Sequence, residues 1–268
     1  MSSAATPETG PPFDTGRTLA LSLAILASNA GALALTAVLI NLPALAYQLF
    51  LIAAPGAEVP EGALPTDPLY AATIRAEQRH MAILMGASMV LSALSTSTLI
   101  HRVLQQIQGK SLGLAGSLRA GLGSARTILL INLASALLMF LGGLAFLVPG
   151  LLAMTMLFVA APAAIAEGRG VIDSLRRSVE LTRGSRWGLL GLVLLAFSML
   201  VGLNLVAFLA VADLKAKIPL ANPRLQAISA VLSVLFQALT SVTMTVAYLE
   251  LRRKREGTSS APVGASPP

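Results

Sequence analysis

The sequence contains no cysteine, which excludes disulfides, iron–sulfur clusters and zinc sites built on thiolates. Charged residues are also scarce: they make up 12% of the 268 residues, whereas a water-soluble domain carries about 25%. Apolar residues account for 55% of the chain, and its mean hydropathy is +0.78. So few charges cannot cover the surface of a soluble globular domain, and the composition therefore predicts an integral membrane protein. The net charge of +7 indicates orientation in a charged membrane rather than nucleic-acid binding.

Five long stretches without any charged side chain define the predicted membrane spans. A helix that rises 1.5 Å per residue needs about 20 apolar residues to cross a hydrocarbon core of about 30 Å. Three of the stretches therefore hold one span each. The stretch 127–166 has a turn signal at Leu147–Gly150 and is predicted to form a hairpin of two spans. The six predicted spans are residues 32–54, 80–101, 128–147, 151–166, 187–211 and 226–249.

The first uncharged stretch, residues 18–57, differs from the others. Its early part contains Ser22, Ser28 and Asn29, and a turn at Asn29–Gly31 would leave a first helix too short to cross a membrane. We therefore expect an amphipathic helix that lies in the membrane interface, followed by one span. Residues 1–14 and the Gly/Ser/Pro-rich segment 257–268 are predicted to be disordered around a membrane domain of residues 15–256.

Basic residues are distributed unequally between the two sides of the membrane. The side with the N-terminus, the loops 102–126 and 167–187 and the C-terminal tail has 14 of the 19 Lys and Arg residues, and the other side has 5. Because cytoplasmic loops carry the excess of basic residues, both termini are predicted to be cytoplasmic. The first dozen residues lack the basic n-region of a cleavable signal peptide, so none is expected.

The two long cytoplasmic loops resemble each other. Residues 109–126 and 168–187 are each predicted to form a Ser-Leu-Arg helix that Gly-Ser closes just before a span, and a fainter copy begins at Ser22. The predicted fold is therefore all-α, a polytopic membrane protein with six transmembrane helices plus interfacial amphipathic helices, with the repeat suggesting three tandem helix-span-span units.

The helix predicted over residues 171–183 carries an apolar stripe of Ile172, Leu175 and Val179. Asp173 is placed to pair with Arg177, and Arg176 can reach Glu180. The helix would lie flat beneath the bilayer with its arginines toward the lipid headgroups, where each basic residue adds about 1 kcal/mol of attraction to anionic lipid. These arginines either bind lipid or only fix the topology. The candidate headgroup contacts are Arg176, Arg177, Arg183 and Arg186.

Glu167 lies at the cytoplasmic end of the fourth span, where the helix dipole disfavours a negative charge. It is therefore predicted to have a basic partner, and the nearest in sequence are Arg169, Arg183 and Arg186. Pro162, five residues earlier, would loosen or kink this helix end. Pro162, Glu167 and Gly184 are thus candidates for a structural clamp that fixes the helix beneath the fourth span, or for a hinge or headgroup site.

A run of motifs in the second half of the chain resembles a known family. The run comprises Val148-Pro149-Gly150, Ala161-Pro162, Glu167, Gly170, Ser174-Leu175-Arg176-Arg177-Ser178, Leu181-Thr182-Arg183-Gly184, Trp187 and the closing Tyr248-Leu249-Glu250-Leu251-Arg252 with Glu256-Gly257. It is similar to the membrane domain found with bacterial glycerophosphoryl diester phosphodiesterases and to the YciC-like six-span inner-membrane proteins, over roughly residues 13–257. The resemblance implies a bacterial inner-membrane protein. The soluble phosphodiesterase barrel that follows this domain in some relatives has no counterpart here, so no catalytic residue is implied.

No motif indicates catalysis, and no cofactor or metal is expected. Gly-rich phosphate loops, zinc-ligand spacings, paired carboxylates and the common serine-nucleophile motifs do not occur in the sequence. His80 and His101 lie near opposite ends of the second span, about 30 Å apart in a straight helix, so they cannot share a metal.

The spans also contain no charged residue between their ends, which counts against an ion-coupled carrier. Their amide side chains either join helices by hydrogen bonds or line a substrate path. These amides are Asn41, Gln48, Asn132, Asn204 and Gln237.

These features favour a non-enzymatic membrane protein that organises the envelope or its lipids, or that serves as a scaffold for a partner. Its expected partners are membrane lipids, anionic ones among them, and another membrane protein; no nucleic acid is expected. The alternative is a transporter or channel for a small or amphipathic solute, with a cavity lined by the span amides. A membrane-embedded hydrolase would need a nucleophile–base pair that the sequence does not reveal.

Overall fold

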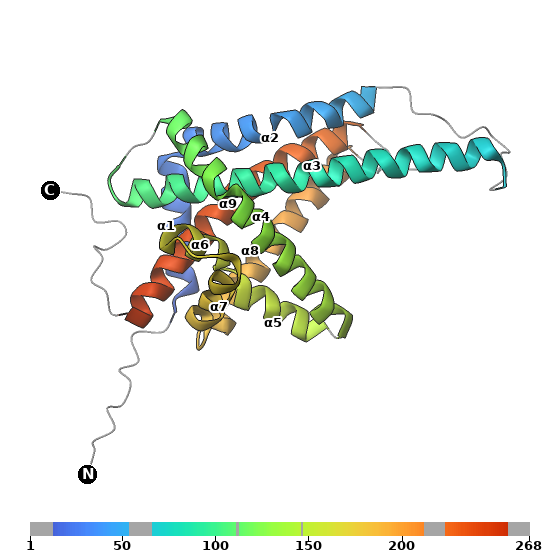
Figure 1. Ribbon diagram of the computed structural model, residues 1–268. Helices are drawn as coiled ribbons and strands as arrows, with labels where there is room; N and C mark the ends of the chain where they lie inside the picture. Colours follow the sequence, from blue (N-terminus) through green and yellow to red (C-terminus); the bar gives the residue numbers. More distant parts are fainter. Residues whose placement is uncertain (1–12, 54–65, 111–112, 146, 212–222, 257–268) are drawn as a thin grey trace, which may run out of the picture.

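The computed structural model describes residues 13–53, 66–110, 113–145, 147–211 and 223–256. Over these residues the chain is helical and has no strand (Figure 1). The helices are α1 (Thr15–Ser28), α2 (Ala30–Ala53), α3 (Pro68–Ile107), α4 (Leu114–Ala145), α5 (Leu147–Leu157), α6 (Ala160–Glu167), α7 (Val171–Thr182), α8 (Arg186–Val211) and α9 (Pro223–Glu256).

Five helical stretches are long and apolar enough to cross a membrane, and the number rises to six when the bent pair α1–α2 counts as one span. The five are Tyr70–Ile107, Leu114–Leu144, Pro149–Glu167, Arg186–Val206 and Ile228–Glu256. Large apolar side chains such as Phe140 and Phe197 are exposed along them. A water-soluble monomer seldom exposes so much contiguous apolar surface, so the expected membrane character is supported.

The helices α1 and α2 meet at Asn29, where the chain bends by 81°. Asp14 caps the start of α1, since its Oδ1 accepts a hydrogen bond of 3.1 Å from the backbone N–H of Arg17. The first helix ends at Ser28, at the turn expected from the sequence around Asn29. The bend gives α1 a direction different from that of α2.

Glycines allow the close turn between α4 and α5. A Cβ on Gly142 would lie 3.1 Å from the backbone N of Gly150, so larger residues would push the two helices apart. The turn predicted at Leu147–Gly150 is placed slightly too far along the sequence, because Pro149 and Gly150 already belong to the first turn of α5. A proline is tolerated there because the first N–H groups of a helix have no partner within it.

The predicted fourth span is divided between α5 and α6, with a break at Phe158–Val159. Pro162 explains the break, because a proline ring clashes with the carbonyl four residues earlier, which here belongs to Phe158. The loosened helix end predicted around Pro162 is thus observed, one turn before the proline. Pro162 itself is buried in α6.

The two similar loops fold differently. The prediction of a separate Ser-Leu-Arg helix closed by Gly123-Ser124 is wrong, because α4 runs without interruption from Leu114 to Ala145. In the second copy α7 does end at Thr182, and Gly184 adopts a φ of +87° before α8 begins. Gly123 lies inside α4, and its neighbour Gly121 packs closely against Thr98 of α3.

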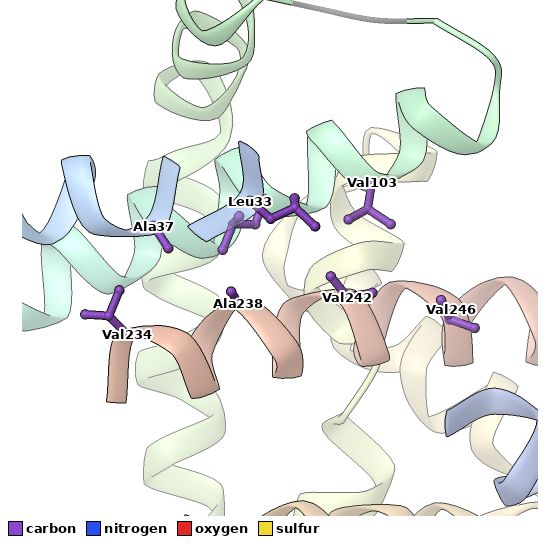
Figure 2. Close-up of a cluster of buried hydrophobic side chains, with 8 residues drawn as sticks. Leu33, Ala37, Val103, Val234, Ala238, Val242 and Val246 are labelled. Atoms are coloured by element: carbon purple, nitrogen blue, oxygen red, sulfur yellow. The ribbon is translucent and has the colours of Figure 1, made fainter. Parts of the chain in front are cut away.

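The helix α9 lies at the centre of the molecule (Figure 1). One buried cluster joins it to α2 and α3, and Figure 2 shows Leu33 and Ala37 of α2 facing Val234 and Ala238 of α9. A second cluster joins α9 to α6, α7 and α8 around Tyr248. In contrast, only 11% of the most apolar part of α4 is buried, so most of its apolar surface is exposed.

Candidate functional site

Glu167, the last residue of α6, is the centre of a polar cluster. Gly168 ends the helix with a φ of +63°, and the Glu167 side chain is only 10% exposed. Its Oε1 accepts hydrogen bonds of 3.0 Å from Arg177 Nε and 2.9 Å from Tyr248 OH. Its Oε2 accepts a hydrogen bond from Arg169 Nε. Three donors therefore satisfy a carboxylate that the helix dipole alone would destabilise.

The cluster continues to the end of α9. Arg177 also forms an ion pair with Glu256, whose Oε2 accepts a 2.8 Å hydrogen bond from Arg252 Nε. Arg252 NH1 in turn lies 3.4 Å from Tyr248 OH. We call the six residues of α6, α7, α9 and the α6–α7 link that these bonds connect the Glu167 network; they are Glu167, Arg169, Arg177, Tyr248, Arg252 and Glu256.

Arg177 links the two carboxylates of the Glu167 network, Glu167 and Glu256. Burial lowers the pKa of Arg177, but its hydrogen bonds and ion pairs with Glu167 and Glu256 raise this pKa by more, so the guanidinium pKa lies above its usual value. Its charge is therefore held inside the protein. Among the four predicted headgroup contacts, Arg177 is the one that forms ion pairs with carboxylates of the described residues.

Glu167 has the basic partner that was predicted for it: Arg169, one of the three arginines named as nearest in sequence, pairs with it. The stronger partner, Arg177, was instead expected to pair with Asp173. The structure pairs Arg177 with Glu167, Glu256 and, at 3.8 Å, Glu180. Tertiary packing turns Arg177 toward α6 and α9, which local helix spacing does not reveal.

The packing of α7 explains this orientation. Its buried side chains are Ser174, Ser178, Leu181 and Thr182, so α7 docks through small hydroxyl residues. Ser178 Oγ donates a 2.7 Å hydrogen bond to the carbonyl of Met156 in α5. The predicted apolar stripe is split: Leu175 packs partly into the core, while Ile172 is 73% exposed.

Contacts gather α1, α7–α8 and the end of α9 at one end of the molecule. Thr15 Oγ1 donates to the carbonyl of Gly188 at 3.0 Å, and Arg255 NH2 donates to the carbonyl of Arg183 at 2.7 Å. Arg17 Nε lies 4.0 Å from Glu250 Oε1. We call this the arginine-rich end. Arg176, Arg183 and Arg253 are exposed there, Arg186 is half-buried, and Trp187 at the start of α8 is 83% exposed.

A second polar cluster lies among α2, α3 and α9. Asn41 Nδ2 donates to Ala37 O at 2.8 Å and to Gln237 Oε1 at 3.3 Å. Gln237 Nε2 donates to the backbone carbonyl and the hydroxyl of Ser92, at 3.1 and 2.8 Å. Two of the predicted span amides thus join three helices by hydrogen bonds.

A cavity of about 300 Å³ adjoins this amide cluster. The cavity is open to the outside of the protein, and Ser233 in its lining is exposed. We call it the amide cavity; the described residues that line it are Asn41, Leu45, Ser88, Ser92, Ala230, Ser233, Val234 and Gln237.

The other predicted span amides lie elsewhere. Asn204 of α8 donates to the carbonyl of Leu200 in its own helix at 2.9 Å, and Asn132 of α4 is half-buried. The side chain of Gln48 lies outside the described residues.

The structure brings together a histidine and a serine that the sequence did not connect. His101 Nε2 lies 2.9 Å from Ser124 Oγ, which is 2.7 Å from Ser97 Oγ. These bonds therefore join α3 to α4. His80 is exposed on α3, far from His101 along the same continuous helix.

A family model described as a domain of unknown function (DUF7847) matches residues 15–251. The chain belongs to this family. The DUF7847 match begins at the first residue of α1 and ends at residue 251. It therefore includes Glu167, Arg177 and Tyr248 but not Arg252 or Glu256. No curated protein and no solved structure matches the chain. Among the described residues of this DUF7847 chain, no group of three or more His, Asp or Glu side chains could hold a metal ion.

Proposed function

We propose that this is a non-enzymatic integral protein of the bacterial inner membrane that binds anionic lipid headgroups at its arginine-rich end and organises the surrounding lipid. In this proposal the helices cross the membrane six times, with α1 and α7 at the interface and both termini in the cytoplasm. The likeness to the phosphodiesterase-associated membrane domains is part of the proposal, since it suggests a role next to lipid-processing proteins.

One observation carries the proposal: α7 is fixed on one side and free on the other. Arg177 and the buried serines hold α7 against α5, α6 and α9, and Arg176 lies on the exposed side with Ile172 four residues before it. The exposed Arg183 caps the end of α7, and the exposed Trp187 follows in the first turn of α8. Basic side chains next to an exposed indole are typical of protein surfaces at lipid headgroups.

The test compares two variants that lose the same charge. The first variant, Arg176→Gln with Arg183→Gln, removes two exposed arginines from the arginine-rich end. The second variant, Arg75→Gln with Arg79→Gln, removes two exposed arginines from the N-terminal part of α3. At about 1 kcal/mol per basic residue, the first pair should weaken the preference for anionic over zwitterionic lipid by about 30-fold. The second pair should change it much less.

The measurement is lipid-resolved mass spectrometry of the protein extracted from mixed anionic and zwitterionic membranes. The ratio of anionic to zwitterionic lipid that co-purifies with the unmodified protein and with the Arg75/Arg79 variant should exceed the ratio in the bulk membrane. For the Arg176/Arg183 variant this ratio should fall toward the bulk value. Absence of enrichment in the unmodified protein, or equal loss in both variants, would contradict specific binding at the arginine-rich end.

The second candidate function is transport of a small or amphipathic solute, and the amide cavity favours it. A path across a membrane needs polar groups at membrane depth, and Asn41 and Gln237 lie near the middle of their predicted spans. Flux of neutral solutes into proteoliposomes tests this function independently of lipid binding.

A further inference from the structure

We infer that the amide cavity is a binding site for a small uncharged polyol of about three to five carbons. This inference does not depend on lipid binding at the arginine-rich end. It deepens the second candidate function, because it names the class of solute that such a pathway would contain.

Size limits the ligand. Ligand pockets in proteins have volumes of about 300–1,000 Å³, so the amide cavity, at about 300 Å³, is at the small end of this range. A cavity of this volume can hold a molecule as small as glycerol or a pentitol, and it is too small for a whole phospholipid.

The absence of charge in the described lining of the amide cavity limits the ligand further. The described side chains that line the cavity are amides, hydroxyls and aliphatic groups, with neither a carboxylate nor a basic group among them. Burying an ion costs much more than burying a neutral polar group unless an opposite charge pairs with it. The described lining therefore favours a neutral molecule over a phosphate ester or an amine.

The orientation of the lining groups indicates which hydrogen bonds a ligand must make. Ser233 Oγ donates its proton to the carbonyl of Ser229 at 2.8 Å, which leaves its lone pairs to accept. Asn41 uses Nδ2 in its bonds to Ala37 and Gln237, and its carbonyl oxygen can accept as well. Acceptors of this kind favour a ligand with several O–H donors, which is the chemistry of a polyol.

The apolar side of the cavity agrees with this class. Leu45, Ala230 and Val234 face the same space as the amides. A polyol presents C–H groups between its hydroxyls, so it can contact both sides of such a lining.

The experiment uses the full chain in nanodiscs and measures equilibrium binding of radiolabelled glycerol and xylitol. Ser233→Leu fills the cavity and leaves the Asn41–Gln237 bond in place. Ser198→Leu is the matched control, because Ser198 is also exposed and also donates to its own helix, at 2.9 Å to Leu195 O, but on α8.

We expect saturable binding of at least one of the two polyols, about tenfold weaker or more in Ser233→Leu and unchanged in Ser198→Leu. Unlabelled xylitol should compete, and glycerol 3-phosphate should not. Absence of saturable binding to folded protein, equal binding in both variants, or equal competition by glycerol 3-phosphate would overturn the inference.

A proteoliposome flux assay on the same protein separates this inference from the transport function. Polyol binding without polyol flux would keep the site and remove transport. Flux of another solute without polyol binding would keep transport and remove the polyol site.

Discussion

Removing the carboxylate of Glu167 should destabilise the protein by about 3–5 kcal/mol. Hydrogen bonds to charged groups contribute about 1.5–3 kcal/mol each, and Glu167→Ala removes those from Arg177 and Tyr248. The bond from Arg169 adds little, because that side chain is 43% exposed to solvent. Arg177, at 16% exposed, keeps its ion pair with Glu256 but loses the more buried of the two carboxylates, and loss of one partner from a buried pair costs about 3–5 kcal/mol.

The assay is reversible unfolding of the purified protein in mixed detergent micelles titrated with dodecyl sulfate. Glu180→Ala is the control, since Glu180 also faces Arg177, at 3.8 Å, but is 60% exposed; its loss should change the unfolding free energy by about 0.5 kcal/mol or less. Replacing Glu167 and Arg177 together by methionine should cost much less than the sum of the single changes. A loss below about 1 kcal/mol for Glu167→Ala, or additive losses for the pair, would refute the reasoning.

Glycine substitutions give two further predictions in the same unfolding assay. Gly121→Ala should destabilise the protein by about 1–3 kcal/mol, because its Cβ would lie 3.0 Å from Thr98 Cα where α4 packs on α3. Gly123→Ala has open space and should stabilise α4 by up to about 1 kcal/mol; equal effects would contradict the close packing. Gly184→Ala should cost about 1–2 kcal/mol because of its φ of +87°. Gly191→Ala in α8 is the control and should not destabilise the protein. A Gly184→Ala variant with unchanged stability would refute the proposed turn.

Much of the helical fold could be predicted from where charges are missing. Stretches without ionic side chains correspond to the apolar parts of α2, α3, α4, α8 and α9, because a charge in hydrocarbon is costly. The break near Pro162 could also be predicted, since the clash of a proline with the preceding turn is local.

Helix continuity was less predictable. Gly123-Ser124 and Gly184-Ser185 are alike in sequence, but only the second pair ends a helix. The two segments differ in packing, since Gly121 meets Thr98 of α3, a contact between residues 23 apart in the chain. Such a contact leaves no local signal.

The candidate site was predictable only in part. The helix dipole indicated that Glu167 needs a basic partner, but it could not select Arg177, ten residues later, or Tyr248, 81 residues later. The same holds for Asn41 and Gln237, which are 196 residues apart. A polar residue in an apolar stretch signals that a partner exists, whereas the choice of partner depends on how the helices pack.

The orientation of the arginine-rich end can be tested directly because the chain has no cysteine. Single substitutions Thr66→Cys, Gly113→Cys and Gly170→Cys, all at exposed positions, would be treated in spheroplasts with a membrane-impermeant maleimide. The account predicts labelling at position 66 in intact spheroplasts, and labelling at positions 113 and 170 only after the membrane is permeabilised. Labelling of 113 or 170 in intact spheroplasts, with 66 protected, would contradict it.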